Sequence, residues 1–247
     1  MKKKIDKDKV IELIVVILLG ITAVMTAWAS WIGSLHAGNQ STNYTTSNNL
    51  AAEGNADWNE ASQQLNSDMQ IWNEVSNLEL EVMFASDNNN TEKLDESAYK
   101  LYFVVFNNCS EEFMNKIDFP TEGIADNQDI TDFIVEWVSA DNNALISPFS
   151  DQEYINSYFT DAQAKIDESA KILEQGKKDN HNGDTYGLVS VIYSVVLFLL
   201  GIVGTFKGRK NKVAVMGISL VAFIFATIFM FTIPLPDGFA ISSFFGA

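Results

Sequence analysis

Three long runs of apolar residues divide this chain of 247 residues. The runs extend from about Leu13 to Leu35, from Tyr186 to Phe206 and from Val213 to Ile233, and none of them holds a charged side chain. A helix needs about 20 apolar residues to cross a bilayer, because the hydrocarbon core is about 30 Å thick. Each run therefore predicts a transmembrane helix, and with flanking residues we place the three spans at 10–35, 186–206 and 213–233.

The residues between the first two spans are polar overall, but their apolar positions recur at helical spacing. A segment rich in Ser, Thr and Asn, from His36 to Asn49, reads as a linker. After it, apolar side chains recur every three or four residues, which predicts helices at about 50–84, 92–117 and 130–138, and a fourth that begins with the capping box Ser150–Glu153. No stretch alternates as a half-buried strand does, so the predicted fold class is all-α.

Residues 36–185 are thus expected to form an antiparallel helical bundle. Its first and fourth helices lead out of the membrane and back into it, so we expect them to pack side by side as a stalk. The apolar stripe of the first helix also repeats near seven residues, which is typical of a coiled coil, so pairing with a second subunit stays open. That stripe consists of Trp58, Ala61, Leu65, Met69, Trp72 and Val75.

The basic residues are concentrated in two short segments, 1–9 and 207–212, which hold nine of the sixteen. Residues 36–185 hold 28 of the 32 acidic residues. Because basic loops stay in the cytoplasm, the N-terminus and the 207–212 turn are predicted to be cytoplasmic. The acidic region and the C-terminal tail, 234–247, then lie outside the cell membrane. The residues that set this topology are Lys2, Lys3, Lys4, Lys207, Arg209, Lys210 and Lys212.

An alternative reading of the N-terminus stays open. Lysines, an apolar run and the small-residue sequence Ala27-Trp28-Ala29 resemble a signal peptide, whose cleavage would remove residues 1–29. The orientation of the rest would not change. The net charge of −16 argues against a nucleic-acid partner, which requires a basic patch. The single cysteine, Cys109, excludes an intramolecular disulfide.

The two histidines are the only candidates for a metal site. His36 follows the first span and His181 precedes the second, so both should lie near the outer membrane surface. With Asp179 and Asp184 they could bind a divalent metal or respond to pH. Two histidines without a third fixed ligand favour ordinary interfacial polar residues instead, so we expect neither a metal nor another cofactor.

Small residues within the spans permit close helix contact, either inside the three-helix unit or between subunits of a homo-oligomer. They are Gly20, Ala23 and Ala27 in the first span, Gly201 and Gly204 in the second, and Ala222 and Ala226 in the third.

This layout resembles a family of uncharacterised three-span bacterial and archaeal membrane proteins with an exported helical hairpin, known only as a domain of unknown function. The matching features are Ala56-Asp57-Trp58-Asn59, the segment His181-Asn-Gly-Asp-Thr-Tyr-Gly187 and the turn Lys207-Gly-Arg-Lys210. The resemblance covers about half the chain and implies a fold and a membrane location, but no activity.

No motif of nucleophilic catalysis occurs, so we do not expect an enzyme. The sequence favours a membrane-anchored, non-enzymatic scaffold or interaction protein, with the bilayer and an extracytoplasmic protein as partners. The alternative is an oligomeric channel or transport-accessory subunit whose acidic domains attract cations. Three charge-free spans are too few for a pore within one subunit, so this alternative requires oligomerisation.

Overall fold

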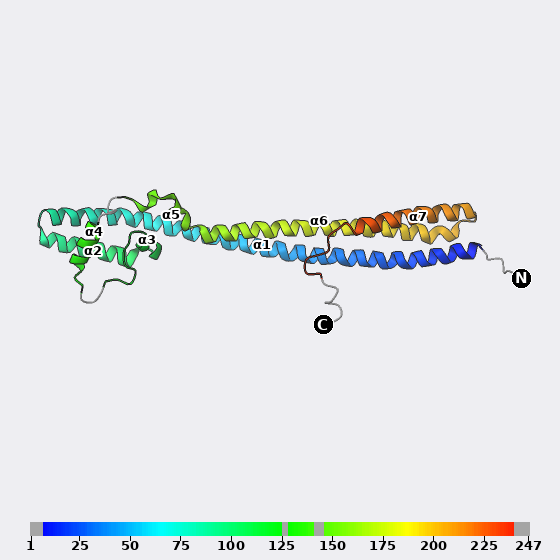
Figure 1. Ribbon diagram of the computed structural model, residues 1–247, viewed down its shortest axis with the longest axis horizontal. Helices are drawn as coiled ribbons and strands as arrows, with labels where there is room; N and C mark the ends of the chain where they lie inside the picture. The colour runs from blue at the N-terminus through cyan, green and yellow to red at the C-terminus, as the bar shows by residue number, and fades with distance from the viewer. Residues whose placement is uncertain (1–6, 125–127, 141–145, 240–247) are drawn as a thin grey trace. The chain divides into compact units, whose positions relative to one another are not determined.

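The computed structural model describes residues 7–124, 128–140 and 146–239; Lys2, Lys3, Lys4 and the last eight residues of the predicted tail lie outside these ranges. No strand occurs within them, which confirms the all-α class. The chain forms two compact units, unit 1 (Met1–Asn49 and Glu168–Ala247) and unit 2 (Leu50–Asp167). The elements are α1 (Lys7–Asp87), α2 (Thr91–Asn108), α3 (Glu111–Lys116), α4 (Ile130–Ser139), η1 (Pro148–Ser150), α5 (Gln152–Ser157), α6 (Thr160–Ile202), η2 (Val203–Thr205) and α7 (Arg209–Met230) (Figure 1).

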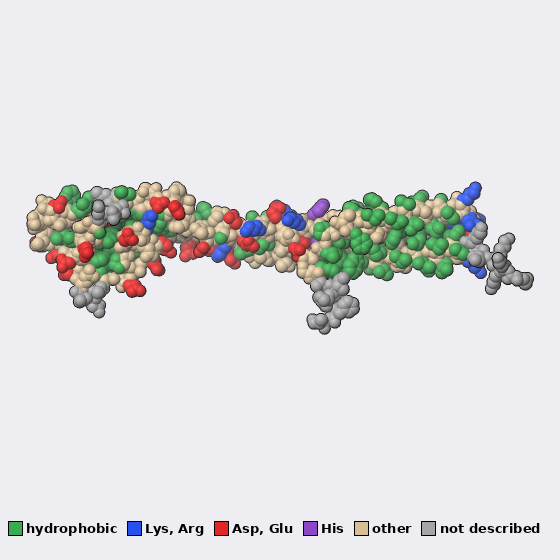
Figure 2. Space-filling view, in the orientation of Figure 1, with side chains coloured by type: hydrophobic (Ala, Val, Ile, Leu, Met, Phe, Trp, Pro, Cys, Tyr) green, Lys and Arg blue, Asp and Glu red, His purple; other side chains and the backbone are tan. Residues whose placement is uncertain are grey.

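Unit 1 contains the three helical segments that are long and apolar enough to cross a membrane. They belong to α1, to α6 with η2, and to α7. Hydrophobic side chains cover most of the visible surface of this part of unit 1, with Lys and Arg side chains at one end (Figure 2). Among them, Val16, Phe198 and Val221 are each more than half exposed. Such a surface is unfavourable in water and favourable in lipid, so the structure is consistent with a membrane protein.

The three apolar segments also pack against one another. Ala29 and Ile32 from α1, Tyr193 from α6 and Ala226 from α7 are fully buried in one cluster. The Tyr193 hydroxyl lies 2.9 Å from Oγ1 of Thr227, which satisfies a polar group that lipid could not. The three apolar segments of unit 1 therefore form a packed core with an apolar exterior.

The segment from His36 to Asn49 is helical, so the predicted linker is wrong. In unit 1 it packs antiparallel against α6, where Ser47 and Ser169 each donate a hydroxyl to the other's carbonyl oxygen at 2.9 Å. Other hydroxyls bond within the helix, as Thr42 does to the Gly38 carbonyl at 3.1 Å. The polar composition suggested a loop, but packing against α6 overrides that weak preference.

Small residues recur where α1 and α6 face each other. Ser169, Gly176 and Gly183 follow one another at intervals of seven residues, a spacing that keeps them on one face of α6. A Cβ atom on Gly176 would lie 2.6 Å from Cδ1 of the Tyr44 ring. One on Gly183 would lie 3.4 Å from the Gly33 carbonyl oxygen. We call this face of unit 1 the small-residue seam, and it allows the two helices to approach closely.

Unit 2 is built around an apolar core between the last part of α1 and the helices α2, α3 and α4. The predicted stripe of α1 is confirmed for Trp72 and Val75, which are buried, whereas Trp58 and Met69 are 39% and 42% exposed. In α2, the expected positions Ala98, Leu101 and Val105 are fully buried. The helix predicted at 130–138 is confirmed as α4, with Ile134 and Val138 in the same core.

The second predicted helix is wrong in its length, because it breaks between α2 and α3. Ser110 starts α3 as its N-cap, with its side chain accepting a hydrogen bond from the Phe113 amide at 3.0 Å. The Ser110 amide donates to the carboxylate of Asp68 at 3.1 Å, and its hydroxyl donates to the same carboxylate. The break thus depends on a residue of α1 that is distant in sequence.

The fourth predicted helix begins elsewhere than proposed. Asp151, not Ser150, caps α5, and it accepts from the amides of Glu153 at 2.9 Å and Tyr154 at 3.3 Å. The Ser150 hydroxyl instead donates to the Ser147 carbonyl. The helix is also interrupted after Ser157, and α6 starts at Thr160.

Candidate functional site

A buried polar layer lies in unit 1 beside the small-residue seam. His36 and Asp179 are each only 1% exposed, and Nδ1 of His36 lies 2.9 Å from the Asp179 carboxylate. Nε2 of His36 lies 3.1 Å from the carbonyl oxygen of Pro234, which can only accept. Nε2 is therefore the donor in that contact. We call His36, Asp179 and their partners the histidine layer.

The other Asp179 oxygen is also used. Asn43 and Gln175 direct their side-chain amides to it, at 3.1 Å and 3.5 Å. Gln175 also donates to the Asp237 carboxylate at 2.9 Å, and Asn39 donates to the Asp237 carbonyl at 3.2 Å. The histidine layer therefore ties the chain that follows α7 to both α1 and α6.

The structure does not bring the two candidate histidines together as metal ligands. Both ring nitrogens of His36 already have partners, and the His181 side chain is exposed on α6. Across the described ranges, no group of three or more His, Cys, Asp or Glu residues is arranged to hold a metal ion. The layer is a closed hydrogen-bond network whose chemistry is structural.

The small residues of the spans fall into two groups. Ala226 is fully buried and Ala222 is partly buried against the other spans. Ala23 and Ala27 are exposed, and a Cβ on Gly20, Gly201 or Gly204 would meet no heavy atom of the described chain within 4 Å. The second group therefore makes no close helix contact with the residues that the structure describes. Among the topology-setting residues, Lys207, Arg209 and Lys210 are exposed and Lys212 is partly exposed.

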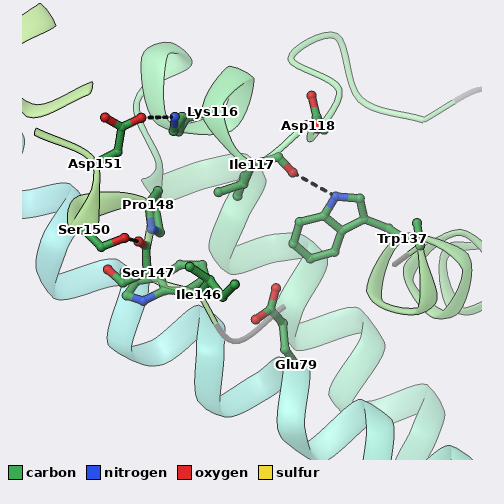
Figure 3. Close-up of a pocket in the computed structure, with 12 residues that line it drawn as sticks. Glu79, Lys116, Ile117, Asp118, Trp137, Ile146, Ser147, Pro148, Ser150 and Asp151 are labelled. Atoms are coloured by element: carbon green, nitrogen blue, oxygen red, sulfur yellow. Dashed lines mark hydrogen bonds and ion pairs between the residues drawn. The ribbon is translucent and has the colours of Figure 1, made fainter. Parts of the chain in front are cut away.

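A cavity of about 270 Å³ opens in unit 2, and an acidic side chain lies in it. Glu79 is only 2% exposed, and its Oε2 atom has no hydrogen-bond partner among the described residues. Burial alone raises the pKa of Glu79 from 4.5 to about 8, because desolvation disfavours the carboxylate. Figure 3 shows the Glu79 carboxyl group directed into the space between Trp137 and Ile146. We call this cavity the Glu79 pocket.

Half of the residues that line the Glu79 pocket are apolar or aromatic. Trp72 from α1 and Trp137 from α4 supply two indole rings, and Trp137 is held by its Nε1–H, which donates to the Ile117 carbonyl at 3.1 Å (Figure 3). Ile146 and Pro148 line the same space. A cavity with apolar walls and one unsatisfied polar group is the usual form of a small-molecule site.

The charged residues that line the pocket are dominated by carboxylates. Besides Glu79 they are Lys116, Asp118 and Asp151. Lys116 is committed elsewhere, because its ammonium group lies 2.8 Å from the Asp151 carboxylate and 5.2 Å from the centre of the Tyr154 ring. The described part of the lining thus directs no cation at Glu79.

A second buried carboxylate of unit 2, Asp68, is fully satisfied. Besides the two bonds from Ser110, it accepts the Tyr158 hydroxyl at 2.9 Å. Burial and this contact with Asp68 raise the pKa of Tyr158, so the phenol stays a donor. The two acids therefore differ. Asp68 accepts hydrogen bonds that hold the fold together, whereas one carboxyl oxygen of Glu79 faces a cavity without a hydrogen-bond partner among the described residues.

Sequence reasoning missed Glu79. The available signal was an acidic residue inside an apolar stripe, since Glu79 lies four residues after Val75 and three before Val82. His36 and Asp179 were candidates from the sequence, but the sequence did not predict that they bond to each other or that His36 contacts the Pro234 carbonyl.

Comparison of the chain with protein-family models, with curated proteins and with solved structures finds no match. The resemblance to three-span membrane proteins therefore stays a prediction from sequence.

Proposed function

We propose that this chain is a multi-pass membrane protein that holds unit 2 outside the cell as a non-enzymatic scaffold or interaction module. The N-terminus and the 207–212 turn lie in the cytoplasm, and the C-terminal tail lies outside. The observation that carries the proposal is the continuity of α1, which extends from its apolar segment to Asp87 without a break. An ordered helical connection, rather than a linker, suits a protein that presents a domain near a bilayer.

The surface of unit 2 supports a protein partner outside the membrane. Tyr99, Phe103 and Phe106 lie on one face of α2 and are 44%, 53% and 37% exposed. Exposed groups of large aromatic side chains are typical of interaction surfaces.

Cysteine labelling in intact cells tests the orientation. In a Cys109→Ala background, Ser86→Cys in unit 2 is expected to react with a membrane-impermeant maleimide, whereas Gly208→Cys in the basic turn should react only after the cells are opened. Both positions are exposed, so the difference reports sidedness. The reverse pattern would place unit 2 in the cytoplasm and end the proposal.

The alternative, an oligomeric channel or transport-accessory subunit, is favoured by one observation. Gly20, Ala23 and Ala27 face outward from α1 and make no close contact within the chain, as do Gly201 and Gly204. Such faces allow helices of separate subunits to pack closely. Native mass spectrometry from nanodiscs distinguishes the two functions, because a monomer excludes a pore, and Gly20→Leu should dissociate an oligomer built on this face.

A further inference from the structure

The unpaired carboxyl group of Glu79 requires a partner. A buried oxygen without a hydrogen bond loses its interaction with water and gains nothing in return, so native structures rarely keep one. Here the atom is Oε2, within a cavity of about 270 Å³. That volume is close to the lower end of small-molecule pockets, roughly 300–1,000 Å³. The site therefore has both the space and the need for a small ligand.

The charges of the lining residues favour a cationic ligand. Glu79, Asp118 and Asp151 are acidic, and Lys116, the one basic residue among the described residues of the lining, is paired with Asp151 at 2.8 Å. An anionic ligand would meet carboxylates without a compensating cation. A metal ion would find too few ligands, since the described chain shows no group of three or more metal-binding side chains.

The apolar residues of the lining favour a ligand with an apolar body next to its charged group. Trp72 and Trp137 present indole rings, and Ile117, Ile146 and Pro148 present aliphatic surface. Indole faces attract organic cations, and the attraction is strongest where water is excluded. Trp137 is already oriented by its hydrogen bond to Ile117, so little ordering is needed when a ligand enters.

From this geometry we propose that the Glu79 pocket of unit 2 binds a small organic amine, with its ammonium group on the Glu79 carboxylate and its apolar body against the apolar residues of the lining, Trp72 and Trp137 among them. The ammonium supplies the hydrogen-bond donor that Oε2 lacks, and the indoles cover the attached carbon atoms. This goes beyond the scaffold function, and it depends neither on the orientation in the membrane nor on the oligomeric state.

Binding of an ammonium group should also change the protonation of Glu79. Burial raises the pKa of Glu79 to about 8, so near pH 7 the empty pocket holds the protonated acid. An ammonium ligand favours the carboxylate, so binding should release close to one proton per site near pH 7 and almost none near pH 9.5. Among the described residues, Lys116, Asp118 and Asp151 are the other titratable groups that line the cavity. Asp151 differs from Glu79, because its hydrogen bond from Lys116 lowers its pKa.

Isothermal titration of the purified full chain in detergent with 2-phenylethylamine tests the proposal, and 2-phenylethanol serves as the neutral probe of the same shape. We expect saturable binding of the amine at one site, and binding of the alcohol about tenfold weaker or more. Glu79→Gln should weaken the amine about tenfold or more. The matched control is Glu74→Gln, an exposed acid of the same helix, which should change nothing.

Proton release gives a second test that needs no variant. Repeating the titration in two buffers of different ionisation enthalpy measures the released proton in wild-type protein, so the proposal stays testable even if Glu79→Gln fails to fold. The proposal would be overturned if the amine did not bind at concentrations up to about 10 mM, since a Kd above that value means negligible affinity. Equal binding of amine and alcohol, or no proton release near pH 7, would do the same.

Discussion

The imidazole of His36 lies 2.9 Å from the carboxylate of Asp179, a residue 143 positions later in the chain. Both side chains are buried, and the Tyr186 ring stacks on the imidazole with centroids 5.8 Å apart. The pair therefore joins α1 to α6 by polar contacts in a place where apolar packing would be expected.

Replacing Asp179 by Ala should destabilise unit 1. The change leaves His36, Asn43 and Gln175 with donors that lose their acceptor, which costs about 1–3 kcal/mol. Thermal unfolding in detergent measures the effect. Asp184→Ala is the control, because Asp184 is exposed on the same helix, and a fall in stability equal to that of Asp179→Ala would contradict the role of the layer.

Glycine substitutions in α1 should have opposite effects at two positions. A Cβ on Gly54 would lie 2.9 Å from Cγ1 of Ile166 and 3.1 Å from the Ala162 carbonyl oxygen, so Gly54→Ala should cost about 1–3 kcal/mol. Gly38→Ala meets no described atom within 4 Å and should stabilise the helix by about 0.5–1 kcal/mol. Chemical denaturation of both variants measures the two changes in the free energy of unfolding. Stabilisation by Gly54→Ala would mean that α1 and α6 are not in close contact at Gly54.

The stability of unit 2 should depend on pH through Glu79. Burial raises its pKa from 4.5 to about 8, so the folded chain keeps a proton that the unfolded chain releases between these values. Its contribution is therefore complete below about pH 4.5 and decreases as the pH rises to about 8. Glu79→Gln has no carboxyl group to ionise, so the stability of the variant relative to wild type should rise by on the order of 5 kcal/mol across that window. Melting curves at several pH values check it, and a constant difference would refute the assignment.

Cys109 should react slowly with thiol reagents. Burial, and to a lesser extent the Asp68 carboxylate, raises the pKa of Cys109 from 9.0 to about 12. Only the thiolate reacts with maleimide. Because the pKa rises from 9.0 to about 12, the fraction of Cys109 present as thiolate near pH 8 falls on the order of a thousandfold. Maleimide kinetics on folded and denatured wild-type chain measure this difference. Labelling of the folded chain as fast as an introduced Ser86→Cys thiol would show that the side chain is not protected.

Local patterns in the sequence predicted those elements whose causes are local. The three apolar segments are confirmed as helices, and so is the break after α1, where Asn89 has a φ of 51° and Asn90 caps α2. α4 was also predicted, because its apolar positions recur within one helix face. Each of these features is determined by residues within a few positions of one another.

The features that the sequence did not predict depend on residues far apart. The α2–α3 break requires Asp68 opposite Ser110, and the helical conformation of the expected linker requires Ser169 opposite Ser47. Likewise, Glu79 becomes a candidate site only because α3 and α4 place Ile117 and Trp137 around it. A periodicity along one segment contains no information about such partners.

The small-residue seam restricts how the length of these helices can change. Each residue inserted between Ser169 and Asp179 would rotate the following part of α6 by about 100°, since a helix has about 3.6 residues per turn. Gly176 would leave the Tyr44 ring, and Asp179 would turn away from His36 unless α1 changed in step. Insertions of seven residues, made opposite one another in both helices, are the changes that preserve this contact. A homologous chain of different length should therefore differ here by whole heptads.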